Sequence, residues 1–273
     1  MKKVLVVFEG THFSSGAFNY AMHLNSLQPI LLTGVFLPQV DYANLWSYGS
    51  GGSGPMFVPL MESVDSAIIQ KNIETFSNLC MTNNIDFRVH KDVMDFALPE
   101  LKRETRFADL LIVGSETFYA NLGSYEQNEY LKDAISQAEC PIIVVPEKSD
   151  IPGSIVIAYD GSKSSVHAIK QFAYLFPELA KLPALLVYVS REHDDFPDSG
   201  NIKELATRHY PDLTFLKLEM DPKKNFSTWL GEQEGAMLVA GAYGRSGFSQ
   251  LFKSSFVSNV IDEHKLPVFI AHT

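Results

Sequence analysis

One stretch near the end of the chain decides the fold: Leu238-Val-Ala-Gly241-Ala-Tyr-Gly244-Arg245-Ser-Gly-Phe-Ser-Gln-Leu-Phe-Lys253-Ser254-Ser255-Phe256. It begins with an apolar run typical of a buried strand, turns at two glycines, and reaches two serines where apolar residues recur at helical spacing. A strand, a glycine turn and a helix N-terminus together make an anion site, because glycines let backbone N–H groups approach an oxyanion and the helix dipole favours negative charge. The stretch therefore predicts an α/β fold with a phosphate site at a strand end.

The spacing Gly241-x2-Gly244-x9-Ser254-Ser255 resembles the nucleotide-binding signature of the universal stress protein family, G-x2-G-x9-G-[ST]. One position departs, since Ser254 stands where the family has its third glycine. If that position needs a positive φ, serine costs roughly 1 kcal/mol more than glycine. The resemblance implies a site for ATP or a related adenine nucleotide, with Mg²⁺ on the phosphates, and a regulatory role in a stress response.

Two other strand ends resemble further parts of the same family site. The segment 158–162 resembles its first loop, whose acidic residue lies beside the adenosine. Val189 falls where the family places an apolar side chain against adenine, although by itself it better fits a core position. An aspartate at a strand end accepts hydrogen bonds from ribose hydroxyls or the adenine amino group, but Asp160-Gly161-Ser162 also fits a turn and a helix N-cap. Arg245 is either a phosphate-binding cation or a solvated side chain. By resemblance the nucleotide-binding residues are Ala158, Tyr159, Asp160, Val189, Gly241, Gly244, Arg245, Ser254, Ser255 and Phe256.

The two halves of the chain repeat one another. In each half, apolar segments alternate with helical stretches, which is the pattern of a parallel sheet covered by helices. We therefore predict two tandem doubly wound α/β domains, residues 1–148 and 152–273, each with a five-stranded parallel sheet. The resemblance adds the strand order 3-2-1-4-5 and helices on both faces. The matched segments are Lys3–Gly10 with Ser154–Gly161, Ala108–Gly114 with Gly235–Gly241, and Cys140–Val145 with Leu266–Ala271.

Each half ends in a short apolar strand after a proline, Pro141–Val145 and Pro267–Ala271, which would lie at a sheet edge. Because an exposed apolar edge invites pairing, we predict that these edges pair antiparallel within one chain and make a pseudo-two-fold monomer. Periodicity also predicts helices at Phe13–Leu27, Met61–Asn83 and Lys163–Phe176, and strands at Ile30–Phe36, Phe87–Val89, Ala184–Val189 and Thr214–Leu218.

The first half departs much further from the nucleotide signature. Its strand-end acid is Glu9 rather than aspartate, and its counterpart of the second glycine is a threonine. Glutamates flank the place where small residues are needed, and their charge repels a polyphosphate. We expect this half to have lost its phosphate site and to serve as a structural or partner-binding domain, so that one nucleotide binds per chain. The residues at the changed positions are Thr117, Glu126, Gln127, Asn128 and Glu129.

Residues 38–59 make a long connection in the first half. They contain Gly49-Ser-Gly51-Gly52-Ser-Gly54, which matches the dinucleotide pattern G-x-G-x-x-G. That pattern binds a dinucleotide only when it directly joins a strand to its helix, and here Pro38–Tyr48 intervenes. We interpret the segment as a loop whose aromatic residues suit a lid or an interaction surface.

Composition limits the partners. The chain has 273 residues, of which 46% are hydrophobic and 20% charged, and a net charge of −10. That charge argues against nucleic acid or an anionic membrane as partner, and no apolar run reaches membrane-spanning length. The two cysteines, Cys80 and Cys140, fit free thiols in a reducing cytoplasm. We expect a cytoplasmic protein that binds a small-molecule nucleotide; its protein partners and a homodimer are left open.

Other chemistry finds little support in the sequence. The motifs G-x4-G-K-[ST], H-E-x-x-H, C-x-x-C and G-x-S-x-G do not occur. His193-Asp194-Asp195 with Asp198 is a weak metal candidate and better fits a solvated loop. We expect no catalytic residues and at most slow ATP hydrolysis. Two rival functions remain: a nucleotide-free scaffold that acts through its surfaces and residues 38–59, and a site for another small anion or a cyclic nucleotide.

Overall fold

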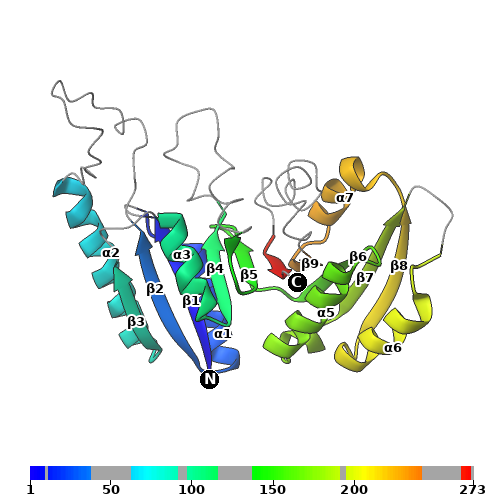
Figure 1. Ribbon diagram of the computed structural model, residues 1–273, viewed down its shortest axis with the longest axis horizontal. Coiled ribbons are helices and arrows are strands. Elements are labelled where there is room, and N and C mark those ends of the chain that lie inside the picture. Colours follow the sequence, from blue (N-terminus) through cyan, green and yellow to red (C-terminus); the bar gives the residue numbers. More distant parts are fainter. Residues whose placement is uncertain are drawn as a thin grey trace, which may run out of the picture.

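The computed structural model describes residues 1–9, 12–37, 63–91, 97–115, 137–190, 195–241 and 266–271. The strands of the first half are β1 (Lys2–Glu9), β2 (Ile30–Leu37), β3 (Asp86–Lys91), β4 (Leu110–Gly114) and β5 (Ile142–Val145). Those of the second half are β6 (Ser154–Tyr159), β7 (Ala184–Ser190), β8 (Leu213–Glu219), β9 (Ala236–Gly241) and β10 (Val268–Ala271). Within the described ranges these strands form one continuous sheet, β3-β2-β1-β4-β5-β10-β9-β6-β7-β8 (Figure 1). The α/β class and the order 3-2-1-4-5 are confirmed.

The two halves of the sheet meet at β5 and β10. Neighbouring strands within each half are parallel, whereas β5 and β10 are antiparallel. Ile143 and Phe269, which each stand two residues after the matched prolines, pair with one another at the centre of the register. Equivalent residues of the two repeats therefore lie opposite each other, as a two-fold relation at the seam requires. The predicted antiparallel pairing of the two edge strands is confirmed.

Helices cover both faces of the sheet. The helices α1 (Ser15–Leu27), α2 (Ser63–Thr82), α5 (Lys163–Leu175) and α6 (Ser199–His209) contribute to one core cluster, and α3 (Ala97–Arg106) and α7 (Pro222–Gly231) contribute to the other. Helix α1 begins two residues later than periodicity predicts, because Ser14 caps it by accepting a hydrogen bond from Ala17 N at 3.2 Å. Ser162 caps α5 in the same way. Local capping chemistry therefore sets both helix starts.

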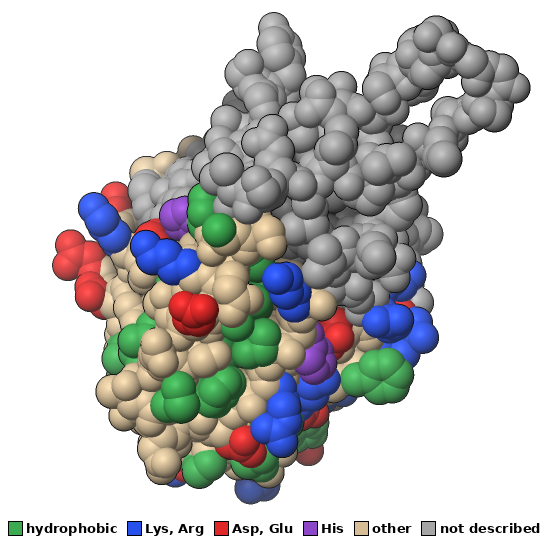
Figure 2. All heavy atoms as spheres, turned by 90° about the vertical axis from the view of Figure 1, so that its left-hand side faces the viewer, with side chains coloured by type: hydrophobic (Ala, Val, Ile, Leu, Met, Phe, Trp, Pro, Cys, Tyr) green, Lys and Arg blue, Asp and Glu red, His purple; other side chains and the backbone are tan. Residues whose placement is uncertain are grey.

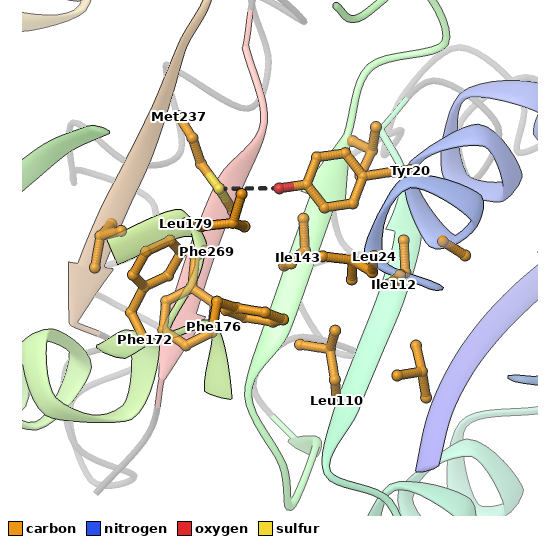
Figure 3. Close-up of a cluster of buried hydrophobic side chains, with 14 of the residues drawn as sticks. Tyr20, Leu24, Leu110, Ile112, Ile143, Phe172, Phe176, Leu179, Met237 and Phe269 are labelled. Carbon is orange, nitrogen blue, oxygen red and sulfur yellow. Dashed lines mark hydrogen bonds between the residues drawn. The ribbon is translucent and has the colours of Figure 1, made fainter. Parts of the chain in front are cut away.

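The core on the α1 and α5 side crosses the seam without interruption (Figure 3). Phe269 of β10 is fully buried, and its ring centroid lies 5.2 Å from that of Phe172 in α5. From the first half, the hydroxyl of Tyr20 in α1 donates to the Met237 sulfur of β9 at 3.1 Å, and burial raises the pKa of Tyr20. The halves therefore share one core.

The outer edge β3 carries charged side chains, Asp86, Arg88 and Lys91, which discourage pairing with another strand. Figure 2 shows this end of the molecule, where charges of both signs lie among small groups of hydrophobic side chains. Cys80 and Cys140 are buried free thiols, as expected, and burial raises the pKa of each to about 12. No helix in the described ranges is long and apolar enough to cross a membrane. Residues 38–59 lie outside the described residues.

Candidate functional site

The carboxyl ends of β6 and β9 mark the switch point of the second half. From β6 the chain passes through α5 to β7 on one side, whereas β8 leads through α7 to β9 on the other side. The helices α5 and α7 contribute to cores on opposite faces, and the strand ends at such a switch point are where open α/β sheets bind ligands. Asp160 follows β6, Gly241 ends β9 and Val189 lies near the end of β7. The structure thus brings three stretches of the predicted site together.

Gly241 lies directly against the first turn of α5. A Cβ atom at this position would be 2.3 Å from the carbonyl carbon of Ser164 and 2.5 Å from Ser165 N. No side chain fits this gap without moving the helix. The glycine therefore lets the N-terminus of α5 approach the end of β9, a packing role that the sequence did not reveal.

The loop after β6 has the geometry of a turn and a helix cap. The Asp160 side chain accepts a hydrogen bond from Ser162 N at 2.9 Å, and Ser162 Oγ accepts one from Ser165 N at 3.1 Å. Gly161 between them has φ +79°, a conformation that favours glycine. The turn-and-cap role considered from the sequence is present, and Asp160 is exposed at the strand end.

The side chain of Tyr159 points into the core on the α5 and α6 side. Its side chain is buried with α5 and α6, and its hydroxyl donates to the carbonyl oxygen of Pro197 at 2.8 Å. Burial, and then the nearby carboxylates of Asp198 and Asp160, raise the pKa of Tyr159. Pro197 also lies against Gly161, where a Cβ atom would be 2.6 Å from the proline ring. The hydrogen bond of Tyr159 thus links the segment before α6 to the end of β6. Because its side chain is buried, any contact of Tyr159 with a ligand would come from its backbone.

Ala158 and Val189 lie on the opposite face of the sheet from Tyr159. Both are half-buried and pack against the core on the α3 and α7 side. Ala158 pairs with Val187 in the β6–β7 register, so Val189 is two residues nearer the carboxyl edge. Together they present a partly exposed apolar surface beside the strand ends.

Solved structures with this arrangement identify the fold. No protein-family model matches the sequence, and no curated protein matches it. A universal stress protein from Archaeoglobus fulgidus DSM 4304 aligns over 99% of this chain and 96% of its own, with a TM-score of 0.66 and 14% identity. The fold is that of the universal stress proteins.

Two further solved structures are similar to this chain over nearly their whole length. A candidate universal stress protein from Pseudomonas aeruginosa UCBPP-PA14 aligns over 100% of this chain and 93% of its own, with a TM-score of 0.57 and 12% identity. A functionally unknown protein from Pseudomonas aeruginosa PAO1 aligns over 100% of this chain and 92% of its own, with a TM-score of 0.58 and 12% identity. Because coverage is nearly complete in both directions, the likeness extends over both halves.

The rest of the predicted nucleotide site lies outside the described residues. This applies to Gly244, Arg245, Ser254, Ser255 and Phe256, and to the changed first-half positions Thr117 and 126–129. Of the weak metal candidate, Asp195 and Asp198 are described; Asp198 precedes α6 in a left-handed conformation, φ 47°. Among the described residues no group of three or more histidines, cysteines or acids could hold a metal ion.

In the first half, a carboxylate of the chain itself lies at a helix N-terminus. Glu147 accepts hydrogen bonds from Ser14 Oγ at 2.9 Å and from Ser15 N at 2.8 Å, at the start of α1. A Cβ atom at Gly16 would be 2.3 Å from the carbonyl oxygen of Pro146, so the linker presses against the helix. The negative charge of Glu147 is favoured by the positive end of the helix dipole. Glu147 begins the linker of residues 147–153 that joins the two halves, and its contact with α1 could not be predicted from the sequence.

Proposed function

We propose that this protein is a universal stress protein that binds ATP or a related adenine nucleotide in its second half, as part of the regulation of a stress response. One observation carries the proposal: Asp160, Val189 and Gly241 lie at the carboxyl ends of three neighbouring strands, β6, β7 and β9, beside the switch point between β6 and β9. Separate parts of the nucleotide signature thus share the one place where a doubly wound sheet binds ligands.

The described residues suit the nucleoside end of such a ligand. Ala158 and Val189 offer apolar surface for a purine ring, and the Asp160 carboxylate accepts hydrogen bonds from hydroxyl or amino groups. The backbone at Gly244 and the hydroxyls of Ser254 and Ser255 would hold the phosphates, with Arg245 as a nearby cation. Bound Mg²⁺ would neutralise part of the phosphate charge in a chain of net charge −10.

A thermal-shift titration with MgATP tests the proposal. A ligand that binds only the folded state at about 100 times its Kd adds roughly 2.7 kcal/mol of stability, so the unfolding midpoint should rise. Gly244→Asp should abolish the rise, because it places a side chain and a negative charge at the phosphates. Gly153→Asp is the matched control, since a Cβ atom there meets nothing within 4 Å. A midpoint that stays constant up to millimolar MgATP in the unmodified protein would instead favour the nucleotide-free scaffold.

A further inference from the structure

A second cleft lies along α1, on the side where the linker of residues 147–153 passes the helix. Its volume is about 360 Å³, within the range of roughly 300–1,000 Å³ typical of small-molecule sites. None of its lining residues belongs to the proposed nucleotide site. The polar ones are Asn19, His23 and Ser26 of α1, Asn83 after α2, and Ser149 and Asp150 of the linker.

The linker wall of this cleft is held at both ends. At one end Glu147 binds the first turn of α1 through Ser14 and Ser15, at 2.9 and 2.8 Å. At the other end Gly153 N donates to the carbonyl oxygen of Gly235 at 2.8 Å. The residues between these two anchors therefore do not have to be ordered by a ligand, which lowers the entropic cost of binding.

The cleft offers several hydrogen-bond acceptors. Ser26 Oγ donates to the His23 carbonyl at 2.7 Å, and Ser149 Oγ donates to the Asp150 carbonyl at 3.2 Å. The Asn83 amide nitrogen donates to the Leu79 carbonyl at 2.8 Å. The side-chain oxygens of the two serines and of Asn83 remain as acceptors beside the Asp150 carboxylate, and the amide groups of Asn19 and Asn83 and the His23 imidazole add donors.

The charge of the lining selects among ligands. Asp150 is its one ionised side chain among the described residues, because no lysine or arginine lines the cleft. Burial lowers the pKa of His23, so the imidazole stays neutral at physiological pH and does not repel a cation. A phosphate or carboxylate would meet acceptors and a like charge. An ammonium group supplies up to three donors and a positive charge, which matches both features.

We propose that this cleft between α1 and the linker binds a small organic amine in its ammonium form, such as a linear diamine or an amino alcohol. The net charge of −10 raises the local concentration of such cations around the whole protein. The site itself is distinguished from that general field by Asp150 and the acceptors around it.

Saturation-transfer NMR with 1,4-diaminobutane and its neutral counterpart 1,4-butanediol tests this proposal on the nucleotide-free chain. The diamine should bind saturably and lose affinity as salt rises, whereas the diol should not bind. Asp150→Asn keeps the shape of the site but removes its charge, and should weaken diamine binding about two- to fivefold, because Asp150 is exposed and water screens its ion pair. Asp212→Asn removes an exposed charge elsewhere and should leave binding unchanged.

Three outcomes would overturn the proposal. Equal binding of the diol would show that the cleft takes polyols rather than ammonium groups. Equal losses in the two variants would show that the diamine only follows the general negative field, and no saturable binding would show that the cleft is not a site. Gly244→Asp should bind the diamine normally, so failure of the nucleotide proposal would be seen separately.

Discussion

At the scale of single residues, the same residue type can stabilise or destabilise depending on its partners. Thr33 in β2 is fully buried, and no hydrogen-bond partner for its hydroxyl lies within the described residues. Thr105 in α3 is equally buried, but its hydroxyl donates to the Lys102 carbonyl at 2.8 Å and accepts from Glu139 N at 3.0 Å. A buried polar group without a partner carries its full desolvation cost, whereas a paired one does not.

The same substitution should therefore change stability in opposite directions at these two positions. Thr33→Val replaces an unpaired hydroxyl by a methyl group of similar size and should stabilise the fold by about 1 kcal/mol. Thr105→Val leaves Glu139 N without its acceptor and should destabilise it by about 1–3 kcal/mol. Urea unfolding of both variants measures the difference. If Thr33→Val is as destabilising as Thr105→Val, the Thr33 hydroxyl has a partner after all.

At the scale of elements, features encoded by neighbouring residues could be predicted and long-range contacts could not. The start of α5 follows from Ser162, because an N-cap acts on amides two or three residues away. By contrast, Glu147 and Ser15 are 132 residues apart, and no periodic pattern in the sequence predicts their contact. Gly241 illustrates both cases: its spacing predicted a turn near phosphates, but only the fold shows the α5 backbone against it.

The contact of Glu147 with α1 should contribute measurably to stability. Glu147→Ala removes two hydrogen bonds from the start of the helix and a charge that the helix dipole favours, so we expect a loss of about 1–2 kcal/mol. Glu178→Ala is the control, because its 2.8 Å ion pair with Lys181 is exposed and should contribute less than about 0.5 kcal/mol. Equal losses in chemical unfolding would mean that the Glu147 contact has no special weight.

At the scale of the whole molecule, the seam makes the two halves one folding unit. The pairing of β5 with β10 was predicted from two apolar strands after prolines together with the strand order that the resemblance implies, because an apolar edge is costly to leave exposed. The sequence did not predict that the core would cross the seam, since Tyr20 and Met237 are 217 residues apart. Half of the nucleotide signature, from Gly244 to Phe256, rests on the sequence pattern alone.

A charge placed in the seam should disrupt this unit. Val144 is 1% exposed and pairs with Val268, so Val144→Lys buries an unpaired ammonium between the halves. We expect a loss of at least about 3 kcal/mol and self-association through exposed apolar surface, measured by analytical ultracentrifugation. Met81→Lys, at a side chain that is 61% exposed, should change neither property. A Val144→Lys protein that stays monomeric at full stability would contradict a buried apolar seam between β5 and β10.

The most direct test of the central claim is calorimetric titration of the purified chain with MgATP. We expect saturable binding with one nucleotide per chain, because the signature lies in the second half and Glu147 already holds the N-terminus of α1 in the first. The binding heat should disappear in Gly244→Asp and persist in Gly153→Asp. Two equivalent sites per chain, or no binding heat at millimolar MgATP in the unmodified protein, would contradict this claim.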